Sequence, residues 1–232
     1  MTSSNNPQTA YEYFYRGNER CDNGDYDGAI ADYTKVLHLK PNHVSAWVNR
    51  GLVWNTKNEY DKAIGDFSEA IRLYPSDAKF WFCRGSVYNN KKEYSKSIAD
   101  YDEAIRLNPG YVNAWYNRGT VWAQKGNFDK AVADFSETIR LDSTCVDAWY
   151  NRATAWLDKG EYEKSIIDYS ETILLTPKDA KAWHNRGRAW QKKGEYDRAI
   201  ADFDEAIRLN PNNQISFDRR ALAIEQKSAK KD

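Results

Sequence analysis

The chain has 232 residues, of which 41% are hydrophobic and 14% aromatic, and this is enough for a substantial core. Its 34 Lys and Arg residues balance 34 Asp and Glu residues, which argues against nucleic acid or an anionic membrane as the partner. The N-terminus lacks the apolar run of a signal peptide, so none is expected. No stretch approaches the roughly 18 apolar residues of a membrane span. Three cysteines without a CxxC pair favour a reducing, cytoplasmic setting.

Tryptophan recurs along the chain with a fixed period of 34 residues. The recurring residues are Trp47, Trp81, Trp115, Trp149 and Trp183. Such a period predicts a repeat architecture in which each unit is one supersecondary element. With this tryptophan at position four, six units follow one another: 10–43, 44–77, 78–111, 112–145, 146–179 and 180–213. Residues 1–9 are polar and are expected to form a disordered tail.

Each unit carries the pattern of two amphipathic helices. In the unit 112–145, Trp115, Gly119 and Trp122 follow the i, i+4, i+7 spacing of one helix face. Ala131 and Phe135 begin a second such face, and a proline near the end of most units stops the second helix. One hairpin cannot bury its apolar face alone, so the units are expected to stack. Four units have a glycine suited to a helix C-cap between the two helices: Gly24, Gly126, Gly160 and Gly194.

Over residues 10–213 this pattern resembles the tetratricopeptide repeat (TPR) family. It departs from the family at three positions, where Ala153 replaces a glycine, Ser143 a proline and Arg20 an aromatic residue. The resemblance implies an all-α solenoid, in which antiparallel helix pairs form a right-handed superhelix. It also implies a concave groove lined by the first helix of each pair, and a role as a protein-binding scaffold.

Residues 214–232 are interpreted as a capping helix with a short basic tail. Phe217, Ala221 and Ile224 repeat the spacing of positions four, eight and eleven, so we expect them to cover the last apolar face of the stack. Arg219, Arg220 and Lys227 are expected to face solvent.

Position seven is arginine in all six units, and position twenty-three is aspartate. The arginines are Arg16, Arg50, Arg84, Arg118, Arg152 and Arg186, and the aspartates are Asp32, Asp66, Asp100, Asp134, Asp168 and Asp202. Both positions lie beside apolar ones on the faces where the two helices meet. We predict that each arginine pairs with the aspartate of its own unit, as a structural ion pair rather than as a binding site for an ionic ligand.

The sequence shows no arrangement typical of an active site. Its histidines are His38, His43 and His184, without an HExxH motif or a cysteine cluster for a metal. His38 and His43 are expected to be solvated turn residues. No glycine-rich phosphate loop or activated nucleophile is evident. We therefore expect a non-enzyme with no catalytic residue, metal or cofactor.

The resemblance places a ligand against positions two, five, nine, twelve and thirteen of the first helices. Aromatic anchors beside small polar groups suit a protein or peptide partner, and Asn at position six can bond a peptide backbone. Basic residues gather at the C-terminal end, where Lys181 joins His184, Arg188 and Lys192, so an acidic stretch is expected in the partner. The candidate partner-binding residues are Phe14, Asn18, Asn49, Lys79, Phe82, Tyr116, Asn117, Tyr150, Asn151, His184, Asn185, Arg188 and Lys192.

Three alternatives stay open. The chain could be a self-associating structural or spacer subunit of a larger assembly. It could also resemble the co-chaperones that hold a C-terminal carboxylate in a clamp, for which Asn18, Asn49 and Lys79 match, but Phe14 and Cys83 stand where a Lys and an Arg are needed. RNA binding by a helical-repeat array is weakened by the neutral charge.

Overall fold

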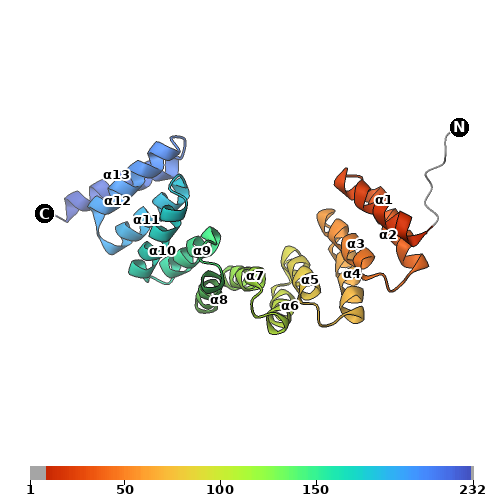
Figure 1. Cartoon of the computed structure of the whole chain (residues 1–232). Coiled ribbons are helices and arrows are strands. Elements are labelled where there is room, and N and C mark those ends of the chain that lie inside the picture. The colour runs from red at the N-terminus through yellow and green to blue at the C-terminus, as the bar shows by residue number, and fades with distance from the viewer. Residues whose placement is uncertain (1–8, 231–232) are drawn as a thin grey trace. The chain divides into compact units, whose positions relative to one another are not determined.

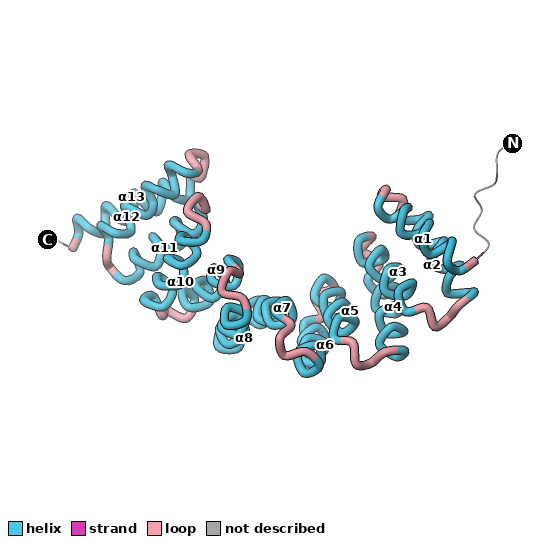
Figure 2. Tube along the Cα trace, in the orientation of Figure 1, coloured by secondary structure: helices cyan, strands magenta, loops and turns pink. Residues whose placement is uncertain are grey.

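Thirteen α-helices and no strand make up the computed structural model within the residues it describes, 9–230 (Figure 1, Figure 2). They are α1 (Ala10–Asp22), α2 (Tyr26–Leu39), α3 (Val44–Thr56), α4 (Tyr60–Leu73), α5 (Ala78–Asn90), α6 (Tyr94–Leu107), α7 (Val112–Gln124), α8 (Phe128–Leu141), α9 (Val146–Asp158), α10 (Tyr162–Leu175), α11 (Ala180–Lys193), α12 (Tyr196–Leu209) and α13 (Gln214–Ala229). Of the tail expected at residues 1–9, only Thr9 lies within the described residues, and its side chain caps α1. The odd-numbered helices α1 to α11 are the first helices of the expected pairs.

The chain forms two compact halves, an N-terminal half that ends at Ala114 and a C-terminal half that begins at Trp115. In the N-terminal half, α1 to α5 each pack on the following helix, and α3 also contacts α1 and α5. In the C-terminal half, α8 to α12 each pack on the following helix, and α11 also contacts α9 and α13. The prediction of an all-α solenoid of stacked helix pairs is confirmed.

A small residue on the first helix accommodates an aromatic ring of the second helix within each pair. Gly187 illustrates this contact, because a Cβ atom there would lie 2.9 Å from Cε1 of Phe203. Phe203 itself is fully buried. The glycine at position eight therefore lets the two helices approach closely enough to enclose the ring.

Positions three and ten of the first helices pack in the other direction, on the preceding pair. Ala189 on α11 belongs to a cluster with Leu157 of α9 and with Ile166 and Tyr169 of α10. Ala189 is fully buried in this cluster. The first helices α3, α5, α9 and α11 thus have two apolar faces, one for their own second helix and one for the preceding pair.

This two-faced packing corrects the expectation for the capping helix. Ser216 and Ala223, at positions three and ten of α13, are fully buried, whereas Phe217 is 42% exposed and Ile224 41% exposed. Ala221 is exposed as well. The stripe of positions four, eight and eleven packs on a second helix of the same pair, and the described residues contain no such helix after α13.

Two cations of α13 that were expected to face solvent make ion pairs on the surface. Arg220 pairs with Asp204 of α12 at 2.5 Å, and Lys227 pairs with Asp197 of the same helix. Lys91 and Asp61 make the equivalent lysine pair, at 2.6 Å, between α5 and α4. These are contacts between a first helix and the preceding second helix, so α13 docks as the first helix of a further pair.

The predicted arginine–aspartate pairing is confirmed in all six units, with Nη2 to Oδ1 distances of 2.5–2.8 Å. The pairs are Arg16–Asp32, Arg50–Asp66, Arg84–Asp100, Arg118–Asp134, Arg152–Asp168 and Arg186–Asp202. Nε of each arginine donates a second bond to the same carboxylate. Burial raises the pKa of Asp66 and Asp202, although the arginine partner acts in the opposite direction.

The turn between the two helices of a pair contains one residue in the left-handed region. Gly24, Gly126, Gly160 and Gly194 have φ angles of 72–81° there, as expected for C-cap glycines. In the other two units, Asn58 has φ 60° and Lys92 has φ 62° at the same place.

Candidate functional site

The candidate residues lie on what we call the first-helix face, made by positions two, five, six, nine and thirteen of the first helices. Its outermost members at position two are exposed in all six units: Tyr11, Ser45, Lys79, Asn113, Asp147 and Lys181. Lys192, at position thirteen, is exposed too. The other eleven candidate residues, at positions five, six and nine, are half-buried.

The side chains at position five rest on the core rings of the second helices. Ring centroids are 5.9 Å apart for Tyr116 and Phe135, 5.6 Å for Tyr150 and Tyr169, and 5.5 Å for His184 and Phe203. Phe14 and Phe82 stack in the same way on Tyr33 and Tyr101. These aromatic residues are fixed by the core, so they offer a partner rigid surfaces.

Phe14 and Phe82 also contact the loop that follows their pair. The ring of Phe14 lies 4.8 Å from that of His43, and the ring of Phe82 lies 4.9 Å from that of Tyr111. Nδ1 of His43 accepts a hydrogen bond from the backbone N–H of Ala46 and so caps α3. The expectation that His43 is a solvated turn residue is therefore wrong, since the ring is half-buried between a cap and an aromatic side chain.

Asparagines at position six connect neighbouring first helices. Nδ2 of Asn151 donates to the Tyr116 hydroxyl at 3.0 Å, and Nδ2 of Asn185 donates to the Tyr150 hydroxyl at 2.6 Å. In the N-terminal half, Nδ2 of Asn49 on α3 donates to Oδ1 of Asn18 on α1 at 3.0 Å. A peptide that bonds to these amides has to use their remaining donor and acceptor positions.

A pocket of about 380 Å³ lies between α1 and α3 on the first-helix face. Its lining residues are Asn18, Cys21, Asp22, Tyr33, Asn49 and Leu52. Leu52 is 46% exposed, and burial raises the pKa of Tyr33 to about 12, so the hydroxyl stays neutral. The pocket therefore combines an apolar side chain with neutral polar groups and the exposed carboxylate of Asp22, which suits a peptide side chain with its backbone.

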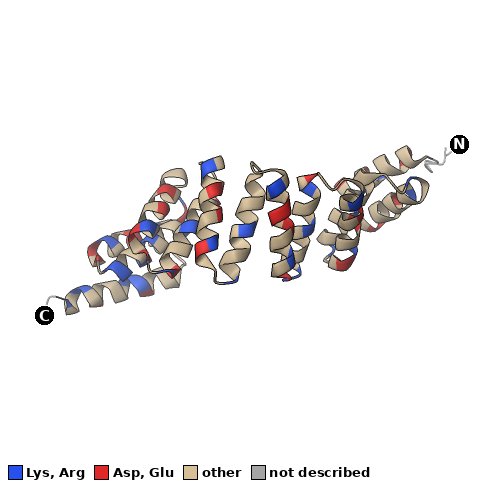
Figure 3. Ribbon diagram, turned by 90° about the horizontal axis from the view of Figure 1, so that it is seen from below, with Lys and Arg blue, Asp and Glu red and all other residues tan. Residues whose placement is uncertain are grey.

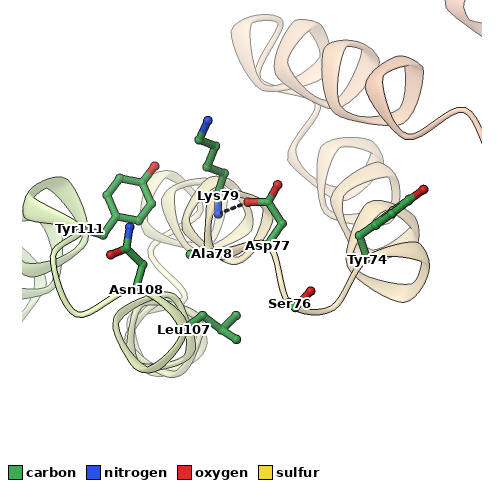
Figure 4. A pocket seen from close by; sticks show the side chains of 8 residues that line it. All are labelled: Tyr74, Ser76, Asp77, Ala78, Lys79, Leu107, Asn108 and Tyr111. Carbon is green, nitrogen blue, oxygen red and sulfur yellow. Dashed lines mark hydrogen bonds between the residues drawn. The ribbon is translucent and has the colours of Figure 1, made fainter.

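A second pocket, of about 490 Å³, lies at the edge of this face between the loops that follow α4 and α6 (Figure 4). Tyr74 and Tyr111 stand on opposite sides of it, and Lys79 extends from the N-terminus of α5 between them. Oδ1 of Asp77 accepts the backbone N–H of Lys79 at 2.9 Å and caps this helix. Lys79 is thus held at the rim with a free ammonium group in solvent.

The carboxylate-clamp alternative finds no cation at its two missing positions. Phe14 is packed between Tyr33 and His43, and Cys83 is half-buried. Burial raises the pKa of the Cys83 thiol to about 11, so it is neutral at physiological pH.

The C-terminal end of the face contains two residues that the sequence analysis did not assign to it. Nδ1 of His184 lies 2.9 Å from Oγ of the buried Ser216, which joins α11 to α13. Arg219 follows Ser216 by one helix turn on α13. It occupies position six, where four units have asparagine, and this departure from the repeat was the signal that could have placed it on the face.

Within residues 9–230 no cluster of histidine, cysteine and acidic side chains is arranged to hold a metal ion. In the same range, none of the helices has the length and apolar character needed to cross a bilayer.

Family models for the tetratricopeptide repeat match residues 112–145 and 180–213, and residues 16–78. A model for the TPR repeat matches residues 85–126. The chain belongs to the tetratricopeptide repeat family. No curated protein sequence matches this TPR protein significantly.

Several solved structures resemble this TPR protein. MamA is 27% identical, covers 75% of this chain and 95% of its own, and has a TM-score of 0.69. YrrB, described as a TPR protein with an unusual peptide-binding site, is 19% identical, covers 82% and 97%, and has a TM-score of 0.72. pilF of Pseudomonas aeruginosa is 19% identical, covers 91% and 96%, and has a TM-score of 0.74. At these identities the latter two show the shared fold alone.

Proposed function

We propose that this TPR protein is a non-catalytic interaction scaffold that binds a segment of a partner protein along its first-helix face. The observation that supports this most is where the repeats differ. The exposed residue at position two changes from Tyr11 to Lys79, Asp147 and Lys181 along the chain. Exposed residues that change between otherwise similar repeats are suited to reading a specific partner.

The outer surface of the second helices is repetitive in four of the six pairs. Four second helices carry the same exposed ion pair three residues apart: Glu69–Arg72, Glu103–Arg106, Glu137–Arg140 and Glu205–Arg208. Lys and Arg are interspersed with Asp and Glu in both halves of the chain (Figure 3). A repeated, solvated pattern of this kind offers a partner little to distinguish one pair from the next.

The proposal includes the candidate residues named above, a protein or peptide as partner, and an acidic stretch in that partner. It includes no cofactor, and it includes no nucleic acid because the charges of the chain balance. It also includes a cytoplasmic location, since Cys21, Cys83 and Cys145 are free thiols that fit a reducing compartment.

An affinity pull-down tests the proposal with two variants that change the net charge by the same amount. The first combines Leu52→Asp, Asp147→Lys and Lys181→Glu, all at exposed positions of the first-helix face. We expect it to lose proteins that the wild type retains, while circular dichroism shows an unchanged fold.

The matched variant combines Lys35→Glu, Ala99→Lys and Ala201→Ser on the outer surface of the second helices, where all three residues are exposed. It should retain the partners of the wild type. Loss of the partners from this variant alone would show that the first-helix face is not the working surface.

Self-association is a second candidate function, favoured by the uncovered stripe of α13. Phe217 and Ile224 lie on either side of the small Ala221 and are 42% and 41% exposed. Such a face can accept a helix of a second copy. Light scattering after size exclusion tests this idea: a dimer that becomes a monomer in Phe217→Lys supports it, whereas a monomer at all wild-type concentrations excludes it.

A further inference from the structure

Arginine is paired almost everywhere in the described part of the chain. Of the fifteen arginines, twelve have a carboxylate oxygen within 4.0 Å. A thirteenth, Arg198, lies over the ring of Trp190 at 4.7 Å. Among residues 9–230, neither Arg188 nor Arg219 has a carboxylate partner at this distance, so these two differ from the rest.

Arg188 and Arg219 lie close together on the first-helix face of the C-terminal half. The contact between Nδ1 of His184 and Oγ of Ser216, at 2.9 Å, joins α11 to α13. Arg188 follows His184 by four residues on α11, and Arg219 follows Ser216 by three residues on α13. Residues with these spacings share a helix face, so the two guanidinium groups stand beside the same contact.

Both arginines also depart from the residues that the repeat places at their positions. Arg188 is at position nine, where the two preceding units have Thr120 and Thr154. Arg219 is at position six, where the preceding first helix has Asn185. The repeat fold therefore does not require an arginine at either position.

Neither arginine has a structural contact that offsets its charge. Nη1 of Arg188 donates one hydrogen bond, to Oδ1 of Asn185 at 3.0 Å. Burial lowers the pKa of His184 to about 4, and both Arg188 and Arg219 contribute to this decrease. The histidine is therefore neutral at pH 7, and neither of the two half-buried cations near it has a carboxylate oxygen within 4.0 Å among the described residues. Such an arrangement destabilises the free protein and favours binding of an anion.

We propose that Arg188 and Arg219 together bind a side-chain carboxylate of an acidic peptide segment that lies across α11 and α13. We call this pair the twin-arginine site. The inference rests on the proposed function, because it names the chemistry of the partner at one end of the first-helix face.

A peptide carboxylate fits this site better than the phosphate backbone of a nucleic acid. A backbone of regularly spaced phosphates needs a continuous series of cations, whereas the chain has no net charge and an exposed acid, Asp147, on the same face. Two arginine forks can bond both oxygens of one carboxylate. Exposed Lys181 and Lys192 on α11 extend the basic surface for further acidic residues.

Fluorescence anisotropy with the full chain tests the site. The probe is a short fluorescein-labelled peptide rich in Glu and Asp, and its counterpart with Gln and Asn is the control ligand. Two variants restore the residues of the repeat, Arg188→Thr and Arg219→Asn. The matched control Arg208→Gln removes the same charge from an exposed pair on α12.

We expect the acidic peptide to bind the wild type and Arg208→Gln with equal affinity. Each site variant should bind it with an affinity at least about tenfold lower. The amide counterpart should not bind. Arg219→Asn should also melt at the same temperature as the wild type or higher, because it removes a like-charge repulsion. A structural arginine would instead lower the melting temperature.

Equal binding of the acidic peptide by all four proteins, or no binding at all, would overturn the twin-arginine site. The same holds if a short RNA binds in an arginine-dependent way and the peptide does not. These outcomes leave the proposed function intact, since the pull-down with the first-helix variant measures it separately. Failure of that pull-down together with arginine-dependent peptide binding would remove the proposed function alone.

Discussion

Arginine at position seven joins the two helices of its own pair, and in α3, α5, α9 and α11 it also contacts the preceding pair. In the fifth repeat, Nε and Nη2 of Arg152 donate to the carboxylate of Asp168. Its Nη1 donates to Oγ of Ser136, in the preceding repeat, at 2.9 Å. The guanidinium also lies 4.9 Å from the ring centroid of Trp149. The sequence predicted the ion pair because both residues recur in every unit. It did not predict the bond to α8, which depends on how neighbouring pairs stack.

Replacing Arg152 with methionine tests the value of such a pair. The side chains of Arg152 and Asp168 are 17% and 5% exposed, so the substitution leaves a buried carboxylate without its partner. We expect the free energy of unfolding to fall by about 3–5 kcal/mol, measured by urea denaturation. Arg140→Met, at an exposed pair with Glu137, is the control and should cost less than about 1 kcal/mol. Equal losses in the two variants would contradict the account.

His184 predicts a dependence of stability on pH. Its pKa in the folded protein, about 4, lies below its ordinary value of 6.5, chiefly because the ring is buried. As pH falls, the unfolded chain binds this proton first, so the stabilisation present above pH 6.5 is lost as pH approaches 4. We expect the wild type to lose about 1 kcal/mol more than His184→Gln between pH 7 and pH 5, since the ring is only half-buried. Parallel pH profiles for the two proteins would contradict this.

The turns inside the pairs show how far local sequence determines an element. The glycine pattern predicted four of these turns, and their φ angles of 72–81° confirm it. Asn58 adopts the same conformation, which asparagine tolerates at the end of a helix. Lys92 adopts it without this tolerance, because the helices on both sides fix the direction of the chain. Helix packing, and not turn chemistry, therefore determines the exception at Lys92.

The turn between α5 and α6 is consequently a place where stability can be gained. Lys92→Gly removes the steric cost of a left-handed lysine, and we expect the free energy of unfolding to rise by about 1 kcal/mol. Gly126→Lys is the reverse substitution at φ 72° and should lower it by a similar amount. Thermal and urea denaturation measure both changes. A destabilised Lys92→Gly would show that the lysine side chain makes a contact that outweighs the backbone strain.

The capping helix shows what periodicity alone did not determine. Phe217, Ala221 and Ile224 matched the spacing of positions four, eight and eleven, and yet Ser216 and Ala223 are the buried residues. A first helix has two apolar faces, and only the one that meets the preceding pair is covered in α13. The sequence identified the helix, but the choice between its faces required the neighbouring helices.

At the scale of the whole chain, the 34-residue period was sufficient to predict the fold, because the buried positions are occupied by similar residues in successive repeats. The candidate face was less predictable. Asn151 and Asn185 were expected to be available to a peptide, and the hydroxyls that they contact, on Tyr116 and Tyr150, belong to neighbouring repeats. Arg219 was overlooked because it lies outside the six units. A surface built across repeats needs the three-dimensional stack for its description.

Site-specific photo-crosslinking tests the central claim, that the partner lies on the first-helix face, most directly. A photoreactive amino acid is placed in turn at Leu52, Asp147 and Lys181 on that face, and at Ala99 and Ala201 on the outer surface of the second helices; all five residues are exposed. We expect crosslinks to the same partner segment from the first three positions and none from the last two. Crosslinks from Ala99 and Ala201 alone would contradict it.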